Sequence, residues 1–380
     1  MGSGCEPSRM TTAFTTRFRF TLRAVLCAAI IFVSLAGTMQ RAAADAAPIP
    51  IRVVVVTTFE VGADTGSAPG EFHHWVKRLP LPQTLPFPQG YRALRYDPAR
   101  GILGIVTGEG AERGAASIMA LGSDPRFDLS HAYWIVAGIA GVDPLAASVG
   151  SAAWATWVVN GDLGFELDAR DMPAGFATGI IPFQRTAPYA LPVPAAESIR
   201  GEEAYRLNGG LARWAYHLTQ HVALPDDARL RALRAPYLAY PNARRAPFVL
   251  LGDSLCGDRF FIGTHMNAWA RRWVAYWTQG HGRYVMTAEE DAGIMQSLTF
   301  LAQAKRVDAA RVLVLRTGSN FTAPGSDKTT AYTLLVHDAD PTGESASREA
   351  FEAAYRIGSR VVSELSGHWV RYRTHVPSGP

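Results

Sequence analysis

The chain has very little cysteine, with only three residues of this type in 380. Cys5 and Cys27 lie near the N-terminus, and Cys256 is the only cysteine after residue 44. A chain that lost its first 44 residues would keep one thiol and could form no internal disulfide. Its stability would then depend on a hydrophobic core. A hydrophobic fraction of 48% is enough to build a core of that kind.

The chain also lacks an excess of charge once its N-terminal segment is set aside. The formal net charge is +4. Residues 1–44 contain five arginines and one glutamate, an excess that equals the whole net charge. The remaining sequence is therefore close to neutral. Its charge gives no indication of a nucleic-acid partner, and we expect none.

No apolar run is long enough for a membrane-spanning helix, which needs about 18–20 residues. The apolar stretch at residues 24–37 is too short, and nothing after it can span a membrane. Arginines precede this stretch, and the small residues 42–44 follow it. That order is typical of a secretory signal peptide. We therefore predict a cleaved signal at residues 1–44, a domain at residues 45–380, and a secreted or periplasmic location.

Short β-branched runs alternate with stretches of helical periodicity along the rest of the chain. Segments rich in glycine and proline, at 62–90 and 164–202, predict irregular connections. The alternation predicts an α/β fold, with a mainly parallel or mixed sheet flanked by helices in a single domain. Strands are expected at 51–56, 101–107, 133–136, 154–159, 248–251 and 311–315, and helices at 110–121, 203–221, 264–279, 288–305 and 347–366.

Two periodic features have a structural explanation. Trp269, Trp273 and Trp277 are spaced by four residues and predict a helix that faces the core. His217 and His221 have the spacing of a zinc pair on one helix face. Because no third ligand accompanies them, we expect no metal site.

Ligands of parallel sheets bind at the carboxyl ends of the strands, and five informative clusters follow predicted strands here. Glycines allow a ligand to approach the backbone, and paired phenylalanines can stack on a flat ring. Carboxylates can accept hydrogen bonds from a sugar diol, although they also suit a helix N-terminus. An asparagine offers both a donor and an acceptor to a purine edge. The clusters lie at residues 107–110, 138–141, 256–261, 289–291 and 316–320.

Taken in order, these clusters resemble the motifs of the nucleoside phosphorylase superfamily. Within it, the chain is most similar to the purine nucleoside permease family, through residues 290–291 and 316–324. The resemblance covers about residues 50–370. The matching positions are Gly108 and Gly110; Gly138, Ala140 and Gly141; Gly257, Asp258 and Phe260; Glu290 and Gly293; and Arg316, Ser319 and Asn320.

The resemblance implies a nucleoside phosphorylase-like fold with a purine nucleoside, or its base, in a cleft at the carboxyl edge of the sheet. By position, Phe260 and Phe261 would border the base and Glu290 would bind the ribose hydroxyls. Asn320 would lie beside the base as the partner of the leaving group. The predicted nucleoside-binding set is completed by Gly108, Gly110, Ile139, Ala140, Gly141, Glu289, Asp291 and Ser319.

The chemistry at this site stays open among binding, hydrolysis and phosphorolysis. Arg113 is the candidate for binding phosphate, which would be a co-substrate; no other cofactor is expected. Glu60 is the candidate for positioning water, and Asn320 would stabilise the leaving base electrostatically. The sequence departs from the family pattern at Glu289, where a methionine is usual.

We therefore expect an exported purine-nucleoside-binding protein that supports nucleoside uptake. The alternative is an extracytoplasmic nucleosidase or nucleoside phosphorylase that cleaves the N-glycosidic bond and releases a purine base. A chain without a spanning helix cannot form a conduit by itself, so a separate membrane transporter is a candidate partner. Homo-oligomerisation and base preference stay open.

Overall fold

The computed structural model describes residues 1–2, 47–67, 70–190, 203–326, 329–338 and 345–380. The chain divides into two compact units, residues 1–49 and residues 50–380. The second unit contains the sheet, the helices and all the clusters discussed above, and the description below concerns it and the strand β1 at its boundary. The predicted signal peptide lies almost wholly outside the described residues, and the boundary at residue 44 stays a prediction.

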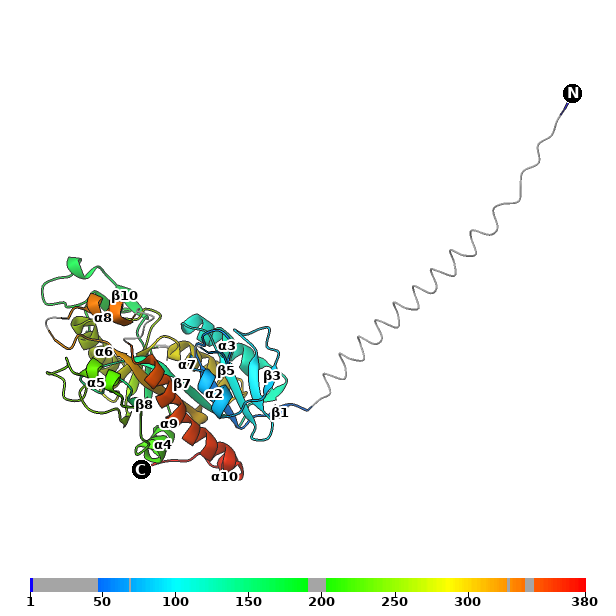
Figure 1. Cartoon of the computed structure of the whole chain (residues 1–380). Coiled ribbons are helices and arrows are strands. Elements are labelled where there is room, and N and C mark those ends of the chain that lie inside the picture. The colour runs from blue at the N-terminus through cyan, green and yellow to red at the C-terminus, as the bar shows by residue number, and fades with distance from the viewer. Residues whose placement is uncertain (3–46, 68–69, 191–202, 327–328, 339–344) are drawn as a thin grey trace. The chain divides into compact units, whose positions relative to one another are not determined.

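A large mixed sheet forms the centre of this unit (Figure 1). Its main path runs in the order β12-β9-β14-β15-β7-β2-β5-β4-β3, while β16 pairs with β7 and β8, and β8 also pairs with β13. In the described part of the chain this sheet has twelve strands: β2 (Val53–Thr57), β3 (Gln83–Leu85), β4 (Leu94–Asp97), β5 (Ile102–Val106), β7 (Tyr133–Val142), β8 (Ala152–Trp154), β9 (Trp157–Asn160), β12 (Ala204–Arg206), β13 (Val249–Leu251), β14 (Asp253–Cys256), β15 (Tyr284–Ala288) and β16 (Val312–Phe321).

Shorter elements and helices surround the sheet. The short strands are β1 (Ile49–Pro50), β6 (Phe127–Asp128), and the antiparallel pair β10 (Gly164–Glu166) and β11 (Ile180–Pro182). The helices are α2 (His73–Arg78), α3 (Ala111–Ser123), α4 (Gly209–Thr219), α5 (Ala228–Arg234), α6 (Thr264–Trp277), α7 (Asp291–Gln303), α8 (Ala331–Asp338), α9 (Ser347–Gly367) and α10 (Trp369–Thr374), with 3-10 turns η1 (Ala169–Asp171) and η2 (Ala309–Arg311).

Helices cover both faces of the sheet, as consecutive residues of β16 show. The Thr317 hydroxyl donates a hydrogen bond to the Ala350 carbonyl of α9, at 2.9 Å. The preceding residue, Arg316, bonds to Asp291 of α7. Successive side chains of a strand point to opposite faces, so α9 and α7 lie on opposite sides of the sheet. The predicted α/β class, with a mixed sheet flanked by helices, is confirmed.

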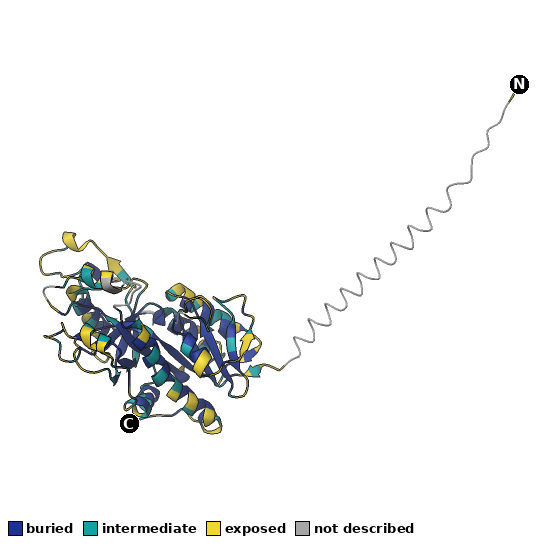
Figure 2. Cartoon of the chain, viewed as in Figure 1, coloured by how far each residue is buried: buried dark blue, intermediate teal, exposed yellow. Residues whose placement is uncertain are grey.

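Apolar residues of the central strands form the core, and Figure 2 shows these strands in the dark blue of buried residues. Val53, Ile135 and Leu313 on three neighbouring strands belong to one buried cluster that also includes residues of α2, α4 and α9. A second cluster contains the tryptophans of α6, of which Trp273 is fully buried. The prediction that the tryptophan stripe faces the core is confirmed.

Two predicted elements are each split in two. The strand expected at 154–159 is interrupted because Asp253 accepts hydrogen bonds from the backbone N–H groups of Thr156 and Trp157, both at 2.8 Å, so β8 ends and β9 begins there. The helix expected at 203–221 begins as the strand β12. Asn208 then caps α4 by accepting a hydrogen bond from the N–H of Leu211.

The two central strands are longer than predicted. The expected strands at 133–136 and 311–315 continue through β7 and β16 to residues 142 and 321. Residues 138–141 and 316–320 therefore lie within strands, not after them. In the register, Arg316 pairs with Gly138, Thr317 with Ile139, and Asn320 with Gly141 after a bulge. The segment at 62–90, expected to be irregular, contains α2 and β3.

No helix in the described part of the chain is both long enough and apolar enough to cross a membrane.

Candidate functional site

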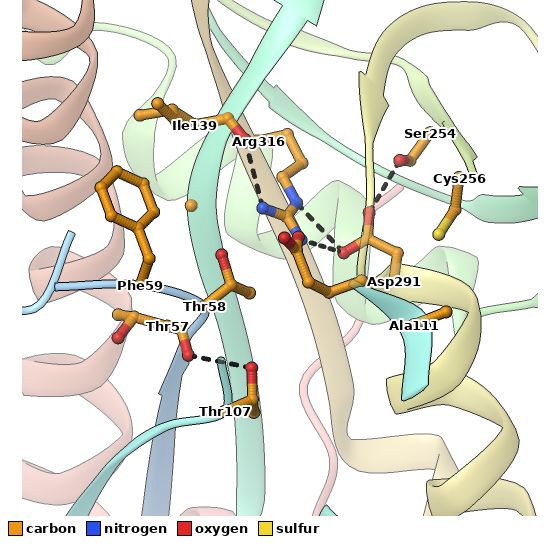
Figure 3. Close-up of polar contacts among 12 residues, drawn as sticks. Thr57, Thr58, Phe59, Thr107, Ala111, Ile139, Ser254, Cys256, Asp291 and Arg316 are labelled. Carbon is orange, nitrogen blue, oxygen red and sulfur yellow. Dashed lines mark hydrogen bonds and ion pairs between the residues drawn. The ribbon is translucent and has the colours of Figure 1, made fainter. Parts of the chain in front are cut away.

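Arg316 lies at the centre of a buried cluster of polar groups (Figure 3). Its Nε and Nη2 donate to Asp291 Oδ1 at 3.0 and 2.5 Å. Nη2 also donates to Glu290 Oε2 at 3.0 Å, and Nη1 donates to the Ile139 carbonyl at 3.2 Å. A guanidinium that is 2% exposed is tolerated because these acceptors compensate its charge.

Asp291 connects the start of α7 to the end of β14. Its Oδ2 accepts a hydrogen bond from Ser254 Oγ at 2.7 Å, and its side chain is fully buried. The next residue, Ala292, donates its N–H to the Cys256 sulfur at 3.1 Å. The helix start is therefore fixed against the strand, which in turn fixes the position of the neighbouring Glu290.

Glu71 is a site residue that the sequence interpretation missed. Its Oε2 accepts hydrogen bonds from the N–H and hydroxyl of Thr58, at 2.7 and 2.9 Å. Its Oε1 accepts from the Ile139 N–H at 2.7 Å, next to the carbonyl that Arg316 binds. Glu71 lies in a segment rich in glycine and proline without a periodic pattern, so no sequence signal indicated it.

Glu60, the predicted water-positioning residue, bonds to the backbone of its own loop. Its carboxylate accepts hydrogen bonds from the N–H groups of Gly70 and His73, each at 2.5 Å. These bonds hold the connection between β2 and α2 in place. A role for Glu60 with water stays a prediction, but Glu71 is the carboxylate that contacts the Arg316 cluster.

The electrostatics of the cluster favour a bound proton near neutral pH. Burial raises the pKa of Glu290 to about 7, although Arg316 opposes the shift. The neighbouring carboxylates of Glu71, Asp291 and Glu289 raise it further. Burial also raises the pKa of Glu71, against the lowering effect of Arg316. Glu290 and Glu71 therefore each hold a proton more readily than an exposed carboxyl does.

Two glycines of β7 make room for the site. A Cβ atom on Gly138 would collide with both Arg316 Nη1 and Glu71 Oε1. A Cβ atom on Gly141 would lie 2.6 Å from the Phe260 ring and 2.7 Å from Thr322 Cγ2. Glycine at these positions allows charged and aromatic side chains to approach the strand closely.

The residues predicted for the base are brought together in part. The Phe260 ring approaches Gly141, and Asn320 pairs with Gly141 in the sheet. The single Ser319 hydroxyl proton has two acceptors within reach, the Ala140 carbonyl at 3.1 Å and Asn320 Oδ1 at 2.8 Å. The ring of Phe261 instead packs edge-on against Trp269 of the core, with centroids 5.6 Å apart.

Carboxylates surround the start of α3, where phosphate binding is a candidate function. The Ala111 N–H donates to Asp258 Oδ1 at 2.6 Å, and the adjacent Gly110 has a left-handed φ of 90°. Burial raises the pKa of Glu289, and Glu109 and Asp258 raise it further. Glu109 and Asp258 therefore both lie close enough to repel the Glu289 carboxylate.

Arg113, the predicted phosphate ligand, lies over neighbouring Gly108. A Cβ atom on that glycine would lie 2.8 Å from Arg113 Cδ. The guanidinium carbon is 5.9 Å from the centroid of the Tyr91 ring. The phosphate role of Arg113 stays a prediction.

No three His, Cys, Asp or Glu side chains of the described residues gather as ligands for a metal ion. The prediction that His217 and His221 share one helix face is wrong, because α4 ends at Thr219 and His221 lies beyond it. The cluster centred on Arg316 instead offers oriented carboxylates beside two glycines. Such a cluster can bind hydroxyl groups or transfer a proton.

The family model and the curated relatives point to one family. The family model described as purine nucleoside permease matches residues 50–377. A probable purine nucleoside permease of Schizosaccharomyces pombe is 30% identical over 270 residues, which cover 70% of this chain and 76% of the relative. The purine nucleoside permease of Candida albicans is 30% identical over 268 residues, which cover 70% of this chain and 64% of the relative.

Among solved structures, this chain is similar to a 5'-methylthioadenosine/S-adenosylhomocysteine nucleosidase from S. pneumoniae, which was determined with a transition-state inhibitor. The TM-score is 0.48 at 14% sequence identity, and the match covers 83% of this chain and 99% of the nucleosidase.

Proposed function

The chain belongs to the purine nucleoside permease family, and on this premise we propose that it binds a purine nucleoside at the Arg316 cluster and supports nucleoside uptake. The observation that carries the proposal is the position of Glu290. This carboxylate follows β15, is 4% exposed, and is held by Arg316 Nη2. A carboxylate fixed in this way can accept hydrogen bonds from two neighbouring sugar hydroxyls without losing further side-chain entropy.

The base would lie beside Gly141, between the ring of Phe260 and the amide of Asn320. Phe260 is 39% exposed and approaches the strand where Asn320 is paired. A purine offers an aromatic face to the ring and polar ring nitrogens to the amide. This placement supports a ligand that combines a flat base with a diol.

The proposed location is outside the cytoplasm, reached through the signal peptide predicted at residues 1–44. There the protein would collect nucleosides and pass them, or the bases released from them, to a separate membrane transporter.

Glu71 favours a second candidate function, cleavage of the N-glycosidic bond. It supplies a second buried carboxyl next to Ile139, whose carbonyl accepts from Arg316. Burial raises its pKa, so this carboxyl gives up a proton less readily than an exposed one and is a candidate for proton transfer. With Glu290 on the ribose, Glu71 would activate water or assist the departing base.

The deciding experiment incubates purified protein with inosine or adenosine, with and without phosphate, and follows free base by chromatography. Base released without phosphate supports a nucleosidase, and base released only with phosphate supports a phosphorylase. Binding measured by calorimetry without base release supports the uptake function. Neither binding nor release would refute both candidates.

Glu290→Gln tests the placement of the site. We expect it to weaken nucleoside binding by about tenfold or more, because a charge-assisted hydrogen bond is replaced by a neutral one. Glu364→Gln is the matched control. Glu364 lies near the end of α9, where it accepts a hydrogen bond from the Tyr372 hydroxyl, and it is not part of the Arg316 cluster. Equal affinities of the two variants would mean that the sugar binds elsewhere.

A further inference from the structure

A cavity of about 440 Å³ lies at the end of β16, between α5, α8 and the start of α9. This volume is within the range of roughly 300–1,000 Å³ that is typical of small-molecule sites. Ser319 and Asn320 form part of its wall, which places it directly beside the predicted position of the base. Its apolar surface comes from Val149, Leu233, Pro236, Tyr237, Phe321 and Leu334.

Two aromatic rings form a fixed wall of the cavity. The ring centroids of Tyr237 and Phe321 are 3.9 Å apart, with the planes tilted by 36°. The Tyr237 hydroxyl donates to the Ala323 carbonyl at 3.0 Å, so its ring is held in place. The two side chains are 3% and 5% exposed. A rigid aromatic wall suits an apolar or aromatic occupant.

Several polar groups of the lining are already engaged within the protein. Arg229 forms an ion pair with Glu349, so its charge is compensated. The hydroxyl groups of Ser319, Ser345 and Thr333 each have a hydrogen-bond partner in the protein. Few hydrogen-bonding groups of the lining are therefore left for an occupant of the cavity. A charged group or a sugar would lose its hydration there without full compensation.

We infer that this cavity binds an apolar group attached to the purine base, so that the protein selects nucleosides with an apolar substituent on the base. The inference rests on the proposed function, because Asn320 is both a wall of the cavity and the predicted neighbour of the base. Burial of the substituent against the aliphatic and aromatic lining supplies the added affinity.

Calorimetric titration of the full protein with adenosine and with N6-benzyladenosine tests this inference. We expect the benzyl derivative to bind at least about tenfold more tightly, the change expected for burying a few apolar carbons. Leu334→Trp fills the cavity from α8 and should abolish this preference while leaving adenosine binding unchanged. Leu335→Trp is the control on the same helix, because Leu335 is 52% exposed and does not line the cavity.

Equal or weaker binding of the benzyl derivative, or a preference that survives in Leu334→Trp, would overturn the inference. If Leu334→Trp does not fold, Ala232→Phe fills the cavity from α5 and replaces it. If neither nucleoside binds, the proposed function fails, and the cavity is then tested with benzyl alcohol by ligand-observed NMR. A signal that is lost in the filled variant supports an apolar site, and no signal refutes it.

Discussion

Arg316 is a charged side chain placed where an unpaired charge would be strongly destabilising. Its guanidinium donates hydrogen bonds to Asp291, to Glu290 and to the Ile139 carbonyl. These partners come from β7, β15 and α7, and each follows or belongs to an element packed into the core. The arginine therefore holds the binding residues in a fixed arrangement.

Replacement of Arg316 by methionine should destabilise the fold by about 3–5 kcal/mol, because it leaves buried carboxylates without their partner. Urea unfolding at pH 8 measures the change in free energy. Arg373→Met is the control, since that side chain is exposed on α10. A loss no larger than that of the control would mean that Arg316 does not stabilise the cluster.

The pKa of about 7 for Glu290 predicts a pH-dependent affinity. The carboxyl is ionised above pH 7 and protonated below it, and the ionised form is the better acceptor for sugar hydroxyls. Affinity for a ribonucleoside should therefore fall by roughly tenfold per pH unit as the pH decreases below 7. Glu71, Glu289, Asp291 and Arg316 face this carboxyl and tune the midpoint.

Calorimetry between pH 5.5 and 8.5 checks this dependence. Glu290→Gln should remove it, because the amide does not titrate. A 2'-deoxyribonucleoside lacks the diol and should show a weaker dependence. A flat profile in the wild-type protein would show that Glu290 does not bind the sugar as an ionised group.

At the scale of elements, the sequence predicted most of the strands and helices but not the length of the two central strands. Glycines and polar residues usually end a strand, so the sequence places residues 138–141 and 316–320 after the predicted strands. In the structure β7 and β16 continue because the Gly138 and Arg316 pair lies inside the sheet, where Glu290 and Asp291 accept hydrogen bonds from the arginine. A local sequence pattern does not show that the charge of a buried arginine is compensated by carboxylates distant in sequence.

The candidate site was predicted where a motif had a fixed spacing and missed where it had none. Glu290 follows β15, and Arg316 follows the apolar run predicted as a strand; the structure brings the two side chains into contact. Glu71 contacts the same cluster only because the chain folds back between β2 and α2. Such a position depends on tertiary structure, which local periodicity does not specify.

Gly141→Ala tests the close approach between β7 and the turn after β14. The added methyl group would overlap the Phe260 ring and Thr322 Cγ2, so we expect a loss of about 1–3 kcal/mol and weaker nucleoside binding. Removing the ring with Phe260→Ala in the same protein should recover part of the lost stability. Thermal unfolding of both single variants and the double variant measures this coupling. Additive losses of stability in the double variant would contradict a contact between position 141 and the Phe260 ring.

At the scale of the whole molecule, the matched family region begins at residue 50, and the second compact unit begins there as well. The predicted signal peptide precedes both. We expect protein recovered from the periplasm of an expressing bacterium to start near residue 45, as measured by intact mass. Protein of full mass in that fraction would refute cleavage, and retention in the cytoplasm would refute export.

The reaction of Cys256 with a thiol reagent can report local opening of the junction between β14 and α7. It is the only thiol after residue 44, it is fully buried, and it accepts the Ala292 N–H at the junction of β14 and α7. A thiol reagent can therefore reach it only when this junction separates. In processed protein, the labelling rate measures how often the site opens, and a ligand that bridges Glu290 and the sheet should slow it.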